Sequence, residues 1–342
     1  NLYDLKSIIG FVLIFILLLW VMNNNRPTQE ELAKHKAEQE QAAAAKNPQN
    51  NTATAATADL GAFAYGNAQA TAKDGVTVIE NKDVKLTINN KGGDLKEVLL
   101  KQFKTYESMP VYLIKDKNAI FALNFKTTQG QELNTQQLYF EPSLSQKDGK
   151  QLLSMKVKTG ENSYLEYVYT LPAEGYMVDV AVRSQGLSGV LNSQNPIELV
   201  WGLKARRMEK SVTYENRYTQ SAIRYADDKI NRMSQGGNSG TKEEQVSWVA
   251  YKQHLFTSVL ISDSAFANGD FLSYNIANEE SKDVKYTKNL KSTFPLKTKG
   301  GELSESLHFY FGPSDYNVLK QYNDKYELTE LIPLGWGIFG WL

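Results

Sequence analysis

Two neighbouring stretches begin the fold, Val76-Thr77-Val78-Ile79-Glu80 and Val84-Lys85-Leu86-Thr87-Ile88, and in both apolar and polar side chains alternate. Side chains of a β-strand point alternately to its two faces, so this period of two predicts strands with one buried face. The polar residues 81–83 between them predict a turn, as does Asn89-Asn90-Lys91-Gly92-Gly93-Asp94 after them. The sequence therefore changes to a β pattern at Val76.

The same pattern continues as far as Phe311. It predicts further strands at residues 95–100, 111–114, 121–125, 152–158, 164–171, 176–183, 197–203, 248–261, 271–275 and 306–311. Glycine, proline and asparagine separate these segments, and 19 tyrosines and 14 phenylalanines favour strands. We therefore expect a mainly β fold, an antiparallel sandwich rather than βαβ units. Residues 204–240 are polar and less regular, with an expected mobile loop at 236–240.

An uncharged apolar run occupies residues 8–22 near the amino end. At about 1.5 Å per residue it spans a little over ~20 Å of a hydrocarbon core roughly 30 Å thick, and flanking residues complete the crossing. The run has no polar face, which argues against a buried core helix. A cleaved signal peptide is the alternative, but residues 23–27 offer no small-x-small cleavage site. We expect residues 1–25 to form a transmembrane anchor.

The segments on either side of the β pattern have their own signatures. Thr28 and Glu31 fit a capping box, so residues 26–75 are expected to begin as a helix and continue, from 47 to 72, as a flexible tether rich in Asn, Thr and Ala. Residues 76–312 would form the β-sandwich domain. Tyrosines and Leu319 at helical spacing predict a connecting helix over 313–330, which docks on the sandwich or lies on a bilayer. Residues 331–342 are expected to start a second membrane segment.

Composition and motifs restrict the function. The 38 basic and 38 acidic side chains balance, so there is no electrostatic footprint for nucleic acid. The sequence has no cysteine and only three histidines, His35, His254 and His308, so a zinc site would need carboxylates and distant partners. We expect His254 and His308 to be satisfied structural residues. No motif of a hydrolase, a P-loop or a zincin is present, and we predict no catalytic, cofactor-binding or metal-ligating residues and no enzyme.

Two weaker signals allow more than one interpretation. Gly335-Trp336-Gly337-Ile338-Phe339-Gly340 matches G-x-G-x-x-G, but Pro333 precedes it and the strand, helix and acidic residue of a dinucleotide site are missing. A membrane segment with small residues and interfacial tryptophan is the better interpretation. Lys204, Arg206, Arg207 and Lys210 form a basic cluster, expected to be a solvated face, with a lipid headgroup or protein contact as the alternative.

Four features in order carry a resemblance to a known family. They are the anchor with its tether, Lys91-Gly92-Gly93-Asp94-Leu95-Lys96-Glu97-Val98-Leu99-Leu100, then Trp248-Val249-Ala250-Tyr251-Lys252-Gln253-His254-Leu255-Phe256, and finally Tyr310-Phe311-Gly312-Pro313 followed by a helix and Gly335-Trp336-Gly337-Ile338-Phe339. Each motif alone is weak, but the ordered set resembles the N-terminal part of YidC-type membrane protein insertases of Gram-negative bacteria. Residues 101–245 match mainly in pattern.

The resemblance implies a fold, a place and a role. The fold would be a large antiparallel β-supersandwich similar to that of sugar mutarotases, lying in the periplasm between an N-terminal transmembrane helix and a C-terminal connecting helix. The full protein would be a multi-pass inner-membrane protein whose helical core follows Leu342. Its partners would be nascent membrane proteins, the Sec translocon and the lipid bilayer, and the β domain would serve as a contact surface and spacer.

Two other functions stay open on the sequence alone. An anchored envelope domain that binds or epimerises carbohydrate is one alternative, because aromatic faces stack on sugars. A mutarotase-like enzyme would need an acid and a base facing each other, for which His254 or His308 with a glutamate would serve. A generic anchored scaffold for an envelope partner is the other alternative.

Overall fold

A computed structural model of the chain describes residues 59–71, 74–233, 237–277 and 284–332. The chain divides into residues 1–58 and a compact unit over residues 59–342, and the fold below is that of the second unit. The predicted anchor at 8–22, the helix after Thr28 and the glycine motif at 335–340 lie outside the described residues. Among the residues that are described, no helix has both the length and the apolar character required to span a membrane.

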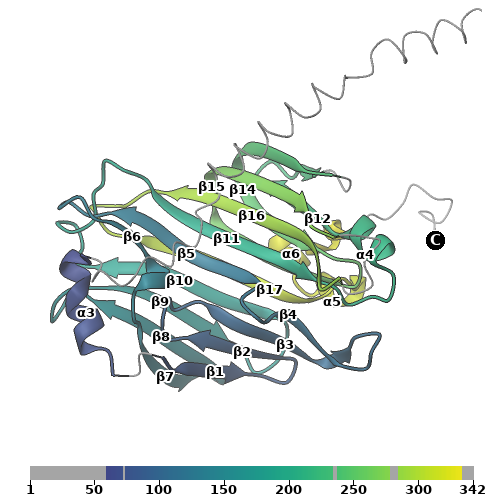
Figure 1. Ribbon diagram of the computed structural model, residues 1–342, viewed down its shortest axis with the longest axis horizontal. Helices are drawn as coiled ribbons and strands as arrows, with labels where there is room; N and C mark the ends of the chain where they lie inside the picture. The colour runs from purple at the N-terminus through teal and green to yellow at the C-terminus, as the bar shows by residue number, and fades with distance from the viewer. Residues whose placement is uncertain (1–58, 72–73, 234–236, 278–283, 333–342) are drawn as a thin grey trace, which may run out of the picture. The chain divides into compact units, whose positions relative to one another are not determined.

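Antiparallel strands dominate the unit (Figure 1). A four-stranded sheet has the order β1-β2-β3-β4, and a 13-stranded sheet has the order β6-β5-β11-β16-β15-β17-β10-β9-β8-β7, with β12, β13 and β14 joined to it through β15. The small sheet consists of β1 (Val76–Glu80), β2 (Val84–Asn89), β3 (Leu95–Lys104) and β4 (Pro110–Ile114). The large antiparallel assembly with a second sheet confirms the predicted β-supersandwich.

The large sheet is built from strands of very different length. They are β5 (Ala119–Lys126), β6 (Glu132–Asn134), β7 (Glu141–Lys147), β8 (Lys150–Lys158), β9 (Tyr164–Leu171), β10 (Met177–Gln185), β11 (Ile197–Arg206), β12 (Gln220–Tyr225), β13 (Ile230–Arg232), β14 (Ser239–Lys252), β15 (Phe256–Asn275), β16 (Tyr286–Leu296) and β17 (Ser304–Pro313). The helical pieces are η1 (Gly61–Phe63), α3 (Ala64–Gln69), η2 (Thr135–Gln137), α4 (Val212–Tyr218), α5 (Tyr316–Lys320), α6 (Asn323–Tyr326) and η3 (Leu328–Leu331).

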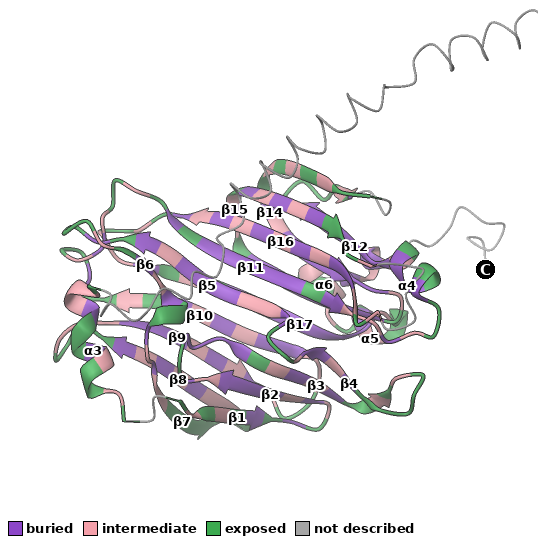
Figure 2. Cartoon of the chain, in the orientation of Figure 1, coloured by how far each residue is buried: buried purple, intermediate pink, exposed green. Residues whose placement is uncertain are grey.

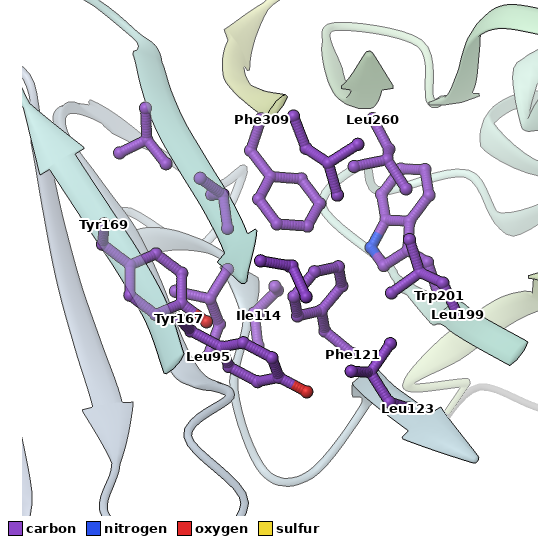
Figure 3. Close-up of a cluster of buried hydrophobic side chains, with 14 of the residues drawn as sticks. Leu95, Ile114, Phe121, Leu123, Tyr167, Tyr169, Leu199, Trp201, Leu260 and Phe309 are labelled. Carbon is purple, nitrogen blue, oxygen red and sulfur yellow. The ribbon is translucent and has the colours of Figure 1, made fainter. Parts of the chain in front are cut away.

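The core lies between the small sheet and the inner face of the large one. Figure 3 shows how side chains from both sheets meet there, with Leu95 and Ile114 from the small sheet facing Tyr167, Trp201 and Phe309 from the large one. Figure 2 shows the burial that this produces along the strands. Alternation in the sequence therefore predicts the inner faces correctly, because each second side chain reaches the core.

One aromatic stack ties the two halves of the large sheet together. The rings of Trp201 on β11 and Tyr251 on β14 are parallel, with centroids 4.0 Å apart. The Tyr251 hydroxyl donates to the Trp201 carbonyl oxygen at 2.9 Å and lies 2.7 Å from the Ser292 hydroxyl on β16. Both rings are buried, so their apolar area adds to the stability of the core while the hydroxyl stays satisfied.

Three expectations from the sequence need correction. Residues 248–261, expected as one strand, form the end of β14 and the start of β15, because a tight turn closes between them with the Gln253 amide donating to the Phe256 carbonyl at 2.8 Å. The polar stretch 204–240 contains α4, β12 and β13, and its Ser239 and Gly240 already belong to β14. Alternation was hidden there because β12 buries polar side chains as well as apolar ones.

The third correction concerns the tether. Flexible chain was expected as far as residue 72, but residues 61–69 fold as η1 and α3. Phe63 is fully buried, with its ring centroid 5.2 Å from that of Phe125. Gly66 lies so close to the Lys158 backbone that an added Cβ would be 2.4 Å from its carbonyl oxygen. One buried aromatic ring and one glycine at a close approach thus order a segment whose composition is typical of a linker.

The Trp201–Tyr251 stack yields a test of the core. We expect Trp201→Ala to lower the free energy of unfolding by about 3–5 kcal/mol, because it removes a fully buried indole and leaves a cavity. Tyr65→Ala, at a tyrosine that is 38% exposed, should stay within about 0.5 kcal/mol of the wild type. Chemical denaturation followed by near-UV circular dichroism measures both, and equal stability of the two variants would contradict this picture of the core.

Candidate functional site

The C-terminal segment, residues 314–332, packs against the large sheet and is the first element of the site. The predicted connecting helix is present as three short pieces, α5, α6 and η3, because Glu327 has a left-handed backbone with φ 52° that ends α6. The buried leucines of this segment contact an apolar face of β12, β14, β15 and β17 formed by Ala222, Trp248, Ala250, Val259, Ile261 and Tyr310. The C-terminal segment therefore docks on the sandwich, which was one of the two outcomes expected from the sequence.

Polar contacts fix the position of this segment. The Trp248 indole N–H donates to the Tyr326 carbonyl at 3.0 Å, so the buried ring is satisfied by the backbone of α6. The Tyr176 amide donates to the Tyr322 hydroxyl at 2.9 Å. Asp315 caps α5 by accepting from the Val318 amide at 3.1 Å. Leu331, the first residue of the expected second membrane segment, is itself buried against the sheet.

A buried arginine adds a charged clamp. The Arg224 side chain on β12 is only 8% exposed and is within ion-pair distance of Asp228 at 2.8 Å, of Glu330 at 3.1 Å and of Glu327. Two of these three carboxylates belong to the C-terminal segment. Burying a guanidinium without partners costs several kcal/mol, so the segment supplies charges that the strand requires.

His308 lies beneath the same segment. Its ring is nearly buried on β17, with Nδ1 2.7 Å from Asp179 Oδ1 and Nε2 3.0 Å from Asp263 Oδ1. Burial opposes ionisation of Asp263, but hydrogen bonds from His308 and Lys325 outweigh it and lower the pKa of Asp263. Lys325 and Tyr326, which contact this group, are both on α6. His308 is thus a structural histidine with both ring nitrogens hydrogen-bonded, as expected from the sequence. It also belongs to the contact between the sheet and the C-terminal segment.

The second cluster surrounds α4, at the end where β11 stops and β14 turns into β15 (Figure 1). Ser211 caps the helix by accepting from the Tyr214 amide at 3.2 Å. Lys288, fully buried on β16, donates to the Asn216 carbonyl at 3.0 Å at the other end of the helix. A cation near the helix C-terminus is also favourable to the helix dipole. This short helix is therefore held from both ends.

Glu215 of α4 is buried and accepts hydrogen bonds from several N–H groups. The Met208 amide donates to its carboxylate at 2.9 Å, the Glu209 amide at 3.2 Å and the Gln253 side chain at 3.2 Å. Burial is the largest influence on this group and raises the pKa of Glu215 to about 7, although the N–H donors work in the opposite direction. The carboxyl therefore titrates near neutral pH and holds the backbone after β11 in place.

His254 lies beside this group, in the turn between β14 and β15 rather than in a strand as expected. Its Nδ1 is 2.7 Å from Glu209 Oε1, and its ring is flanked by Tyr214 and Tyr218 at centroid distances of 5.0 and 4.8 Å. The basic cluster lies at this end too. Arg206 pairs with Asp116 at 2.9 Å, whereas Arg207 donates to the Glu209 carbonyl at 2.9 Å and covers the Tyr106 ring. Of the four residues of the basic cluster, which was expected to be a solvated face, two are therefore engaged in contacts within the fold.

Other candidates from the sequence do not form a reactive site. Among the described residues, no group of three or more metal-ligating side chains is close enough together to hold a metal ion. Glu243 and Glu244 lie on β14, and the Glu243 carboxylate accepts from the Thr241 hydroxyl at 2.6 Å. Two adjoining cavities of about 380 and 410 Å³ share Asn195 and Pro196 as lining residues, and neither is lined by a histidine.

Sequence reasoning missed Glu215 and Arg224. Both are charged residues in a polar stretch, and a single sequence does not distinguish a buried carboxylate from a solvated one. The one local signal was the Ser211 cap in front of α4.

Comparisons with known proteins agree on a family. Residues 76–342 match the model of the YidC periplasmic domain. The chain is 30% identical to the membrane protein insertase YidC of Parabacteroides distasonis, over 99% of this chain and 57% of that protein. It is 31% identical to that of Porphyromonas gingivalis (strain ATCC 33277), also over 99% and 57%, and 30% identical to that of Bacteroides fragilis, over 99% and 56%. The chain thus spans a little over half the length of these curated relatives.

Solved structures with similar architecture are more distant. The periplasmic domain of Thermotoga maritima YidC has a TM-score of 0.35 at 12% identity, covering 75% of this chain and 92% of that one. An active YidC insertase with its first transmembrane domain resolved has a TM-score of 0.38 at 11% identity, covering 75% and 43%. A putative aldose 1-epimerase from Escherichia coli has a TM-score of 0.43 at 8% identity, covering 69% and 98%.

The docking contact can be tested by loosening it. We expect Arg224→Ala to reduce hydrogen-exchange protection of amides in α5, α6 and η3, because three carboxylates then lack their shared cation and two of them are on this segment. Strands β8 and β9, which contribute no residue to the apolar face under this segment, should keep their protection. Lys229→Ala is the matched control, since Lys229 pairs with Asp227 in an exposed turn and its side chain is 78% exposed. Unchanged hydrogen-exchange protection of this segment in Arg224→Ala would show that the ion pairs of Arg224 do not contribute to its docking.

Glu215 predicts a dependence of stability on pH. Its folded pKa is about 7 and its reference value is 4.5, so between these pH values the unfolded chain loses the proton first. The free energy of unfolding therefore falls as pH rises through this window, by about 1.4 kcal/mol per unit and roughly 3 kcal/mol in all.

Glu215→Gln is the reference for that measurement because it cannot ionise. The difference in unfolding free energy between wild type and Glu215→Gln, measured by urea denaturation at a series of pH values, should fall as pH rises towards neutrality and then level off. A difference that does not change with pH would contradict the raised pKa.

Proposed function

This chain belongs to the YidC family of membrane protein insertases, and we propose that it is the N-terminal and periplasmic part of one, which assists the insertion and folding of inner-membrane proteins. The observation that carries the proposal is the match of residues 76–342 to the family's periplasmic domain, on a chain whose apolar run at 8–22 suits a membrane anchor. The whole activity belongs to a longer protein, because the relatives extend well beyond the matched length.

The proposed mechanism requires no reactive side chain. A membrane groove that offers polar groups to a passing segment lowers the cost of moving a polar or charged residue through lipid. The β domain would act as a contact surface and spacer outside the membrane. The docking of residues 314–332 supports this role, since contacts through Trp248, Arg224 and Leu331 hold the C-terminal segment against the sandwich.

The proposed setting follows from the family. The chain would be anchored in the inner membrane by residues 1–25, reach through residues 26–75 to a periplasmic domain over 76–312, and return through 313–330 to a second membrane segment beginning in 331–342. The complete protein would cross the membrane several times. Its partners would be nascent membrane proteins and the lipid bilayer, alone or together with the Sec translocon.

The sandwich itself is proposed to have no enzymatic activity. His308 is covered by α6, and both of its ring nitrogens are already within hydrogen-bond distance of carboxylates. His254 is engaged by Glu209 and two tyrosine rings. Neither arrangement leaves an acid and a base facing each other across an open cleft, which a mutarotase-like reaction requires.

Two measurements test this function. The reading frame beyond Leu342 should encode several hydrophobic helices, and the complete gene should restore integration of a reporter inner-membrane protein in cells depleted of their own insertase. A version ending at Leu342 is the control and should not restore it. Absence of downstream helices, or no rescue by an expressed complete protein, would overturn the proposal. Accelerated mutarotation of an aldose by the chain, followed by polarimetry, would favour the enzymatic alternative instead.

A further inference from the structure

We propose that one end of the domain, here called the α4 end, docks on the surface of an anionic lipid bilayer. The α4 end consists of residues 104–109, 115–118, 204–218, 253–255, 274–276, 284–286 and 314–316. This inference rests on the proposed attachment of the domain to a membrane and names the surface that would face it. Charged side chains and exposed apolar side chains are concentrated at this end of the fold, and this concentration supports the inference.

Printed contacts join these segments into one surface, although they are far apart in the sequence. The Tyr106 amide donates to the Met208 carbonyl at 3.4 Å, the Lys204 amide to the Asn118 carbonyl at 2.7 Å, and the Arg207 amide to the Lys285 carbonyl at 2.9 Å. The Asn216 side chain donates to that of Asn275 at 3.0 Å. The Ser314 amide donates to the Leu255 carbonyl at 2.7 Å, which joins the start of α5 to the β14–β15 turn.

The charge on this surface is unbalanced. The seven segments contain nine lysines and arginines against five carboxyls, one of which is the buried Glu215, whereas the whole chain has 38 of each sign. Six of the cations are exposed, namely Lys104, Lys117, Lys204, Lys210, Arg217 and Lys285. The exposed carboxyls are Glu107, Asp116 and Asp315, and Asp116 is already paired with Arg206 and Lys285. The described segments of the α4 end therefore carry an excess of positive charge, and the chain between residues 276 and 284 adds Lys282 and the carboxyls of Glu279, Glu280 and Asp283.

Exposed apolar side chains gather at the same end of the domain. Of the 11 exposed large hydrophobic residues in the described parts of the chain, seven belong to the α4 end. They are Tyr274 and its neighbour Ile276, together with Tyr106, Met109, Tyr214, Leu255 and Tyr316, the most exposed of which are Met109 at 59% and Leu255 at 52%. Tyrosine with lysine and arginine is the combination found where proteins meet the interface of a bilayer.

The shape of the surface favours a bilayer over a peptide. The cavities of about 380, 410 and 520 Å³ are all lined by residues from other parts of the domain. The exposed apolar side chains at the α4 end stand on turns, at the end of β15 and on the short helices α4 and α5, so none of them requires a concave site to meet a headgroup layer. The sequence after Ile332, Pro333-Leu334-Gly335-Trp336-Gly337-Ile338-Phe339, is apolar and suits the same environment.

Contacts within the α4 end hold its exposed aromatic residues in position. The Arg207 guanidinium lies 5.3 Å from the centroid of the Tyr106 ring, and Tyr214 packs on His254 and Tyr218. Phe103 and Phe256 meet at 5.2 Å behind the β3–β4 and β14–β15 turns. A preorganised surface loses less side-chain entropy on binding, so a modest number of contacts suffices for a measurable interaction.

The chain has no cysteine, which allows a direct test. Leu255→Cys and Tyr316→Cys are labelled with a fluorophore in the 342-residue chain, and the chain is assembled into nanodiscs that carry headgroup spin-labelled lipid. Tyr65→Cys on α3 is the matched control, because Tyr65 is 38% exposed and α3 contacts Lys158 away from the α4 end. We expect strong quenching at 255 and 316 with phosphatidylglycerol, weak quenching with phosphatidylcholine alone, and little at 65 in either lipid.

Charge variants supply the second arm. The triple variant Lys117→Glu, Lys204→Glu and Lys210→Glu should lower the apparent affinity for the anionic surface at least about fivefold for each lysine replaced. Raising the salt concentration to about 1 M should also lower the apparent affinity, because salt screens the attraction between the lysines and the anionic lipid. The triple variant Lys126→Glu, Lys297→Glu and Lys299→Glu changes the same number of exposed lysines elsewhere and should leave the quenching unchanged.

The outcomes separate this proposal from others. Equal quenching in the two lipids, equal quenching at 65 and 255, or no effect of the first triple variant would overturn it. Binding of the α4 end to an acidic protein with no lipid quenching would overturn it as well. Since no substrate is inserted in the experiment, lipid docking can fail while the insertase function stands, and the rescue assay can fail while docking is observed.

Discussion

The second half of strand β14, residues 248–252, is buried on both faces, and this constraint organises the rest of the domain. Val249 and Tyr251 point into the main core, where Tyr251 stacks on Trp201. Trp248 and Ala250 point the other way, into the apolar face that receives the C-terminal segment. Because successive side chains of a strand alternate, a shift of one residue would exchange the two sets and disrupt both contacts at once. The register of this hairpin therefore determines the core and the docking together.

The turn at the end of β14 extends the same constraint to the α4 end. Gln253 donates to the buried Glu215, His254 pairs with Glu209, and the Leu255 carbonyl accepts from Ser314 at the start of the C-terminal segment. One short turn thus contacts α4, the backbone after β11 and the first residues that lead to α5. The polar groups involved are largely buried and paired, which makes the arrangement specific as well as stable.

The functional conclusion follows from this rigidity combined with the family. In this sandwich His254 and His308 are both engaged by neighbouring carboxylates, and His308 lies under the C-terminal segment. Its C-terminal segment is held by an indole hydrogen bond, a buried arginine and three buried leucines. The segment begins at the α4 end, where the Ser314 amide donates to the Leu255 carbonyl at 2.7 Å.

Alternation and turn residues by themselves determined the class of fold and most strand positions, because a half-buried strand leaves a period of two in the sequence. The four motifs, taken together and in order, also indicated the family. Only the tertiary structure decided the remainder. Polar β12, the exposed edge strand β7 and the docked α3 left no readable period, since their side chains are buried by distant partners or not buried at all. The burial of Glu215 and Arg224 and the charge density of the α4 end were also decided only by the tertiary structure. Both depend on which segments contact one another in space, and those contacts cannot be derived from a single sequence.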